Sequence, residues 1–188
     1  GLARLFQALG EPEMARKQIE LLASPEFEHD EQYIIQALPM YRAELAVRQG
    51  DLGSAAEWLT HNGMQVDSPI HFFSEEAMIL QTRILVALQR HPEALHLVER
   101  LLGELEPAGR LGRVLELLIL KAVVLERQQD WDAMNSTFAR ALQLAEPEGY
   151  MRIFLVEGAS MAEIIREIDS RGILPNYTGK LLSAFEAE

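Results

Sequence analysis

The chain has 188 residues, enough for one ordinary domain with a sizeable core, and its composition is that of a globular protein. Its formal net charge of −12 argues against nucleic-acid binding by this chain, because phosphate contacts require a basic face. The absence of cysteine excludes disulfides and thiolate metal sites and predicts a reducing compartment, the cytoplasm. No apolar run approaches the roughly 20 residues of a membrane span, so we expect no membrane association.

The N-terminal quarter is predicted to be helical, with breaks at its prolines. Residues 2–9 already have the character of a helix interior, which predicts an excised fragment whose first hairpin is truncated. A second helix is expected over residues 12–23, with a proline in its first turn. A third is expected over residues 30–49, and Pro39 inside it predicts a kink or break near Leu38.

The middle of the chain alternates helical patterns with turn signals. Ser54–His61 is predicted to be a helix with Trp58 facing inward, and residues 62–73 form the longest irregular piece. Further helices are expected over Ser74–Arg90 and Pro92–Leu105.

Leu117–Pro147 carries the clearest pattern, that of two helices joined by a tight polar turn. Apolar residues recur at three- and four-residue steps, Gln128-Gln129-Asp130 interrupts them, and the same period then restarts. The small residues Ala122 and Ala141 allow two antiparallel helices to approach, and Phe138 fills the space beside them.

This hairpin belongs to a repeat, because one hairpin cannot bury its own apolar face. In four places a turn residue stands five positions before a small or slim residue, and a large apolar residue follows four positions after it. The small or slim residues are 40, 39 and 40 positions apart. The pairs of small or slim and large residues are Ala15 and Ile19, Ala55 and Leu59, Ala94 and Val98, and Met134 and Phe138. The pattern is typical of tetratricopeptide hairpins with a period longer than the usual 34 residues. We therefore predict an all-α fold, a right-handed superhelix of about four antiparallel hairpins over residues 1–147.

The remaining residues, 148–188, are predicted to form a helical C-terminal cap. Tyr150–Val156 has strand propensity, but we predict a short helix because no second strand exists to pair with it. A helix over Ser160–Arg171 is expected to begin with a capping box of Ser160 and Glu163, and Tyr177–Phe185 forms the last helix.

Several stretches resemble one family, that of the MalT-like regulators, which are LuxR-type ATP-dependent transcription activators (the LAL family). The similarity spans about Ala43 to Phe185, and its most specific part lies within Ala139–Gly158 (ARALQLAEPEGYMRIFLVEG); the other matching runs are Arg48–Leu59, Arg113–Leu120 and Leu181–Phe185. The resemblance implies a tetratricopeptide-like sensor region that receives an inducer or a regulatory protein. In the family this region lies between an ATPase domain and a helix-turn-helix domain.

Neither of those two activities is carried over to this chain. It contains no phosphate loop of the GxxxxGK[ST] kind and no basic recognition helix. We therefore expect no cofactor here, with ATP binding confined to the absent ATPase domain. The expected partners are an unknown inducer or regulatory protein and the other domains of the full-length regulator.

Tetratricopeptide arrays bind ligands on the concave surface, which the first helix of each hairpin lines. Aligning the repeats places eight residues on or near that surface: Arg4, Gln7, Glu44, Arg48, Arg83, Glu116, Glu126 and Arg127. Six of them are the candidate binding residues: Arg4, Arg48, Arg83, Arg127, Glu44 and Glu126. One arginine per repeat would form a ladder that holds carboxylates of a ligand or partner. The alternative is that these arginines pair separately with neighbouring glutamates.

No catalytic or metal-binding constellation is recognisable, so we expect a protein that is not an enzyme. None of the five histidines pairs with another ligand at helical spacing, and Ser160 lacks the strand and closing glycine of a nucleophile elbow. Two functions stay open: a sensor domain of a transcriptional regulator, or a generic scaffold for protein–protein interaction. A weak homodimer through the exposed N-terminal apolar face is also expected.

Overall fold

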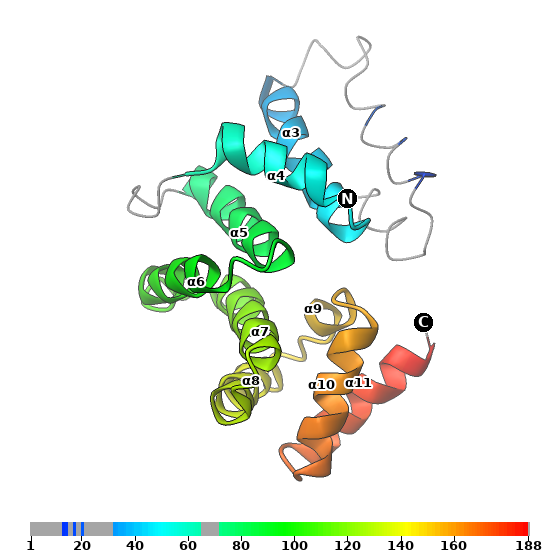
Figure 1. Ribbon diagram of the computed structural model, residues 1–188. Coiled ribbons are helices and arrows are strands. Elements are labelled where there is room, and N and C mark those ends of the chain that lie inside the picture. The colour runs from blue at the N-terminus through cyan, green and yellow to red at the C-terminus, as the bar shows by residue number, and fades with distance from the viewer. Residues whose placement is uncertain (1–12, 15–16, 18–19, 21–31, 65–71, 188) are drawn as a thin grey trace. The chain divides into compact units, whose positions relative to one another are not determined.

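The computed structural model describes residues 13, 14, 17, 20, 32–64 and 72–187 (Figure 1). Every regular element in these residues is a helix, so the predicted all-α class is confirmed. Glu13, Met14, Lys17 and Glu20 are helical, as expected for residues 12–23. The predictions for residues 2–9, Arg4 and the N-terminal dimer face lie outside the described residues.

The chain divides into two compact units, residues 1–93 and 94–188. This division falls inside one helix, whereas the boundary predicted after residue 147 separates the repeats from the C-terminal cap. That boundary and the superhelical sense of the array stay predictions.

The first unit contains three described helices that pack on one another: α3 (Gln32–Arg48), α4 (Leu52–Asn62) and α5 (Phe72–Ala87). Their shared core is made of small residues around one indole; its buried members are Ala43, Ala46, Ala55, Trp58, Leu80 and Ile84. Trp58 is 8% exposed, which confirms its predicted inward orientation. The alanines allow the backbones to approach closely, and the indole fills the space that they leave.

A kink or break was predicted near Leu38: the break is wrong, because α3 continues without interruption through Pro39, and the kink stays a prediction. A proline inside a helix removes one backbone hydrogen bond and crowds the preceding turn. Pro39 lies on the exposed side of α3, while Ala43 and Ala46 pack into the shared core. The tertiary packing of α3 on α4 and α5 therefore offsets a local defect that the sequence pattern alone overstated.

In the second unit, α6 (His91–Leu105, which begins in the first unit) leads to the predicted hairpin of α7 (Leu111–Arg127) and α8 (Trp131–Ala145). Nine residues of α7 are buried, so this helix is the centre of the unit. Two ion pairs link the helices at the surface. Lys121 of α7 binds Glu99 of α6, and Nη2 of Arg140 in α8 lies 2.7 Å from Oε2 of Glu106, just after α6.

The three hairpin turns share one backbone conformation, which is independent evidence for the repeat. Gly50, Gln89 and Gln129 have φ values of +74°, +59° and +61°. In each turn the next residue donates its N–H across the helix end, at N···O distances of 2.9, 2.9 and 3.0 Å; the pairs are Asp51 to Ala46, Arg90 to Leu85 and Asp130 to Leu125. This geometry is the Schellman motif, which satisfies carbonyls that a helix end leaves free.

The second helices of the last two hairpins, α6 and α8, also end alike. The segments 106–109 (EPAG) and 146–149 (EPEG) each finish on a glycine with positive φ, +68° at Gly109 and +69° at Gly149. The residue after each glycine donates its N–H to the last residue of the helix, Arg110 to Leu105 at 3.0 Å and Tyr150 to Ala145 at 3.1 Å. The recurrence of this helix end after 40 residues was readable in the sequence and extends the repeat to the second helices.

The C-terminal segment consists of α9 (Arg152–Leu155), α10 (Ala159–Ser170) and α11 (Pro175–Ala187). The short helix predicted within Tyr150–Val156 is therefore confirmed. Phe154 of α9 is fully buried and meets two rings edge-on, Phe138 of α8 at 5.8 Å and Tyr177 of α11 at 6.4 Å between ring centroids. This aromatic chain joins the last hairpin to the C-terminal helices.

The predicted capping box at Ser160 is wrong. The residue that begins α10 is Gly158, whose φ is +78°, and no side chain caps this helix. A glycine at positive φ turns the chain into the helix two residues early, so Ser160 lies inside its first turn.

Candidate functional site

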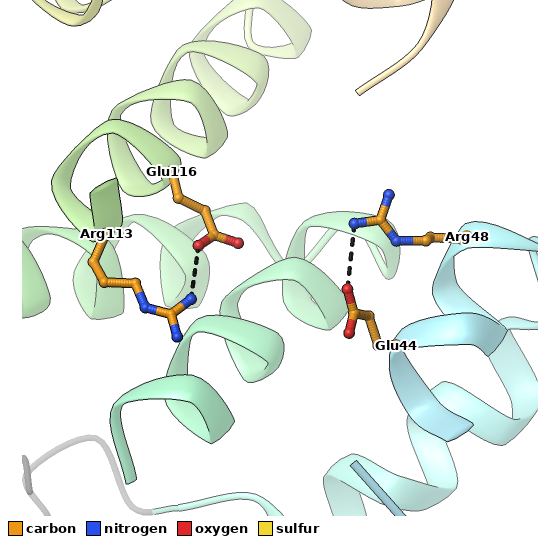
Figure 2. A network of polar contacts seen from close by, with 4 residues as sticks. All are labelled: Glu44, Arg48, Arg113 and Glu116. Carbon is orange, nitrogen blue, oxygen red and sulfur yellow. Dashed lines mark hydrogen bonds and ion pairs between the residues drawn. The ribbon is translucent and has the colours of Figure 1, made fainter. Parts of the chain in front are cut away.

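The predicted concave-face residues of α3 form an ion pair within their own helix. Nη2 of Arg48 lies 3.3 Å from Oε1 of Glu44, and their side chains are 23% and 15% exposed (Figure 2). A spacing of four residues places both on one face of the helix, where such pairs contribute about 0.3–0.5 kcal/mol. Arg48 therefore has a neighbouring glutamate partner, which is the alternative arrangement that the sequence left open.

The other predicted site residues lie on the first helices of the following hairpins. Arg83 is half-buried on α5, and Glu126 is half-buried near the end of α7 beside the exposed Arg127. Both arginines take part in further polar or electrostatic interactions. Whether these residues share one concave surface stays a prediction.

A second arginine–glutamate pair lies at the start of α7. Nη1 of Arg113 lies 3.2 Å from Oε2 of Glu116, with side chains 34% and 18% exposed (Figure 2). Glu116 is among the positions that the repeat alignment selects, whereas Arg113 was not predicted. The signal was present in the sequence, since opposite charges three residues apart at a helix start form such pairs.

The first unit also contains a hollow of about 640 Å³ that the sequence analysis missed. Its walls come from α3, α4 and two residues between them, Gln49 and Asp51, together with Glu20. On α3 the hollow uses Arg42 and Ala46, which lie on the side of the helix away from Glu44 and Arg48. The hollow and the predicted position of Arg48 therefore lie on different sides of α3.

The lining residues on and just before α4 are mostly polar. The Asp51 carboxylate accepts the Ser54 N–H at 3.1 Å and the Ser54 hydroxyl at 2.7 Å. Nδ1 of His61 lies 2.9 Å from the Glu57 carbonyl. Trp58 also lines the hollow, which therefore combines an aromatic side chain with groups that bind polar atoms.

Arg42 is the lining residue best placed to hold an anionic group. Its side chain is exposed on α3, and it makes no ion pair or hydrogen bond with any residue in the described part of the chain. A guanidinium presents a fork of donors that matches a carboxylate or a phosphate. The arrangement can bind and orient a ligand, and we see in it no acid–base or nucleophilic grouping.

Two wider searches of the described residues bear on function. No cluster of three or more histidine, cysteine, aspartate or glutamate side chains there could hold a metal ion. None of the described helices has the length and apolar character needed to cross a bilayer.

The sequence was also compared with known proteins. No curated protein matches it. A family model described as the MalT-like TPR region matches residues 1–171, which is most of the chain and includes every hairpin described above. A TPR-like helical region of this kind is typically a non-catalytic scaffold that senses a signal or binds a partner. The repeat, the all-helical fold and this match together show that the chain belongs to the MalT-like TPR family.

Proposed function

We propose that this chain is the sensing region of a LuxR-type, ATP-dependent transcriptional regulator of the LAL family. It binds an inducer or a regulatory protein and passes that event to ATPase and helix-turn-helix domains elsewhere in the regulator. The observation that carries the proposal is the family match over residues 1–171, supported by the repeated hairpins. In this proposal the chain is no enzyme, needs no cofactor of its own and works in the cytoplasm without touching DNA, in keeping with its charge of −12.

The hollow between α3 and α4 is the proposed inducer site. Its volume of about 640 Å³ lies within the range of roughly 300–1,000 Å³ that small-molecule pockets occupy. Trp58 offers an apolar surface, and Arg42 offers a positive charge that has no ion pair within the described residues. A ligand with an acidic group and an apolar body would use both.

The second candidate is a scaffold that binds another protein and no small molecule. Two observations favour it: most polar residues around the hollow are themselves exposed, and Trp131 at the start of α8 is 46% exposed. Exposed tryptophans are enriched among residues that dominate protein–protein binding energies. A partner that inserts a side chain at either place would make this chain an interaction module.

A thermal-shift screen against small metabolites separates the two candidates. A ligand at one hundred times its Kd adds roughly 2.7 kcal/mol to the free energy of unfolding. For a chain of this length each kcal/mol raises the Tm by about 2–4 °C, so an inducer shifts it by several degrees. Arg42→Ala should abolish the shift for an acidic ligand, while Arg166→Ala, which removes an exposed arginine of α10, should preserve it.

The outcomes are distinct. A reproducible shift that depends on Arg42 supports the sensor and its site. A shift that survives Arg42→Ala supports the sensor but moves its site elsewhere. No shift across a broad library, together with a partner protein whose binding is lost in Trp131→Ala, supports the scaffold.

A further inference from the structure

Asn135 of α8 is an amide buried without partners. Its side chain is 9% exposed, and neither Nδ2 nor Oδ1 has a hydrogen-bond partner among the described residues. The repeat places Leu95 and Ala56 at the equivalent positions of the two preceding hairpins, so hairpin packing itself does not require an amide here. A buried amide with neither polar atom satisfied weakens the packing that encloses it.

The position of Asn135 on α8 indicates which packing is weakened. Phe138 lies three residues later, and its ring meets Phe154 of α9 at 5.8 Å. At 3.6 residues per turn, Asn135 lies only about 60° around the helix from Phe138. The amide is therefore beside the side of α8 on which α9 lies.

The helices α9, α10 and α11 are connected as one body. Each of the three contacts the other two, and the Tyr177 hydroxyl of α11 donates to the Tyr150 carbonyl just before α9. Their attachment to the hairpin is narrow by comparison, because α9 is a single turn (Figure 1). This turn contacts α7, and its Phe154 packs against Phe138 of α8. Gly149, with φ +69°, lies in the link between α8 and α9.

From this geometry we infer that α9–α11 release from the α7–α8 hairpin as one body, and that the unsatisfied amide of Asn135 keeps the docked state only marginally stable. Release moves the backbone near Gly149, hydrates the amide and exposes the Phe138–Phe154 contact. This inference goes beyond the proposed function and does not depend on which ligand the chain binds. It supplies a moving element by which an event in the repeats reaches the C-terminal helices.

Hydrogen exchange of the whole 188-residue protein, followed by mass spectrometry, tests the inference. In the wild type we expect amides of residues 152–187 to exchange together and faster than those of α7 and α8. Asn135→Leu removes the unsatisfied amide and should slow exchange in residues 152–187 by about tenfold. Ser136→Leu adds the same side chain at the neighbouring exposed position and should change nothing there.

Unchanged or faster exchange of residues 152–187 in Asn135→Leu, including failure of this variant to fold, would overturn the inference, since the amide would then contribute to stability. Asn135→Asp gives a second test, because a buried carboxylate strongly disfavours the docked state. We expect it to release residues 152–187 while α7 and α8 keep their protection. Loss of protection in α7 and α8 at the same time would show that Asn135 supports the hairpin itself.

Discussion

Replacing Gln129 by glycine should stabilise the protein, whereas the same change at the adjacent Gln128 should not. Gln129 has φ +61°, in the left-handed region, and Gln128 has φ −81° and ψ −3°, in the right-handed helical region. Both side chains are exposed, and neither has a polar partner among the described residues. The two substitutions therefore remove the same atoms and differ only in backbone conformation.

The magnitudes follow from that conformation. A residue with a Cβ in the left-handed region costs roughly 1–2 kcal/mol, and the greater freedom of glycine in the unfolded chain returns about 0.5–1 kcal/mol of this. Gln129→Gly should thus add about 0.5–1 kcal/mol to the free energy of unfolding. Gln128→Gly relieves no backbone strain, and it should lower the free energy of unfolding by about 0.5–1 kcal/mol because glycine gains more conformational entropy in the unfolded chain.

Urea unfolding followed by circular dichroism measures both free energies, with thermal melts as a second reading. The two variants should differ by about 1–2 kcal/mol, which corresponds to a few degrees in Tm for a chain of this length. Gly50 already occupies the equivalent turn position in the first unit, with φ +74°, so Gly50→Gln should lose what Gln129→Gly gains. Equal losses in Gln128→Gly and Gln129→Gly would refute the reasoning.

Three further predictions concern the aromatic residues and the α3 ion pair. Burial and, to a lesser extent, the neighbouring Glu146 charge raise the pKa of Tyr177 to about 12, so the stability that the protonated phenol contributes is complete below pH 10 and declines as the pH rises through 12. Absorbance at 295 nm should show a tyrosine titration step near pH 12 that Tyr177→Phe removes. A tyrosine titration complete by pH 11 would contradict the raised pKa. Trp58→Ala should lower the free energy of unfolding by about 3–5 kcal/mol and expose residues 32–64 and 72–87 to hydrogen exchange. Trp131→Ala, at an exposed position, should cost under about 0.5 kcal/mol, and similar costs for the two variants would contradict the assigned burial. Exchanging the charges of Glu44 and Arg48 keeps their ion pair and should change the free energy of unfolding by under about 0.5 kcal/mol. The exchange should nevertheless lower the affinity for an acidic ligand that uses the predicted arginine positions. Unchanged affinity would remove Arg48 from the binding site.

The repeat was readable from the sequence because local rules and tertiary packing agree there. The period of apolar residues in α7 and α8, with the polar Gln128-Gln129-Asp130 between them, located the turn of this hairpin and both of its helices, although α7 begins at Leu111, before the predicted stretch. Small residues at Ala122 and Ala141 identified the contact between its helices, and both are fully buried. A side chain's preference for helix, turn or core is a local property, so such features can be predicted without knowing the tertiary structure.

Two local predictions failed for different reasons. Pro39 predicts a break in an isolated helix, but α3 packs on α4 and α5 and stays continuous across it. Ser160 fits a capping box, but Gly158 turns the chain into α10 before it. At Pro39 tertiary packing outweighed the local pattern, whereas at Ser160 a second local feature, a glycine with positive φ, outweighed the first.

By itself the sequence determined the helical class, the 40-residue hairpin repeat, the MalT-like family and the absence of any recognisable catalytic motif. Only the tertiary structure decided which charges meet and which surfaces are left open. Among the described residues it paired Arg48 with Glu44, left Arg42 without an ion pair beside a hollow of about 640 Å³, and buried Asn135 without a hydrogen-bond partner. Periodicity depends on residues three or four positions apart, whereas a hollow or an unsatisfied amide depends on helices that are distant in sequence, and no local pattern specifies how those helices approach.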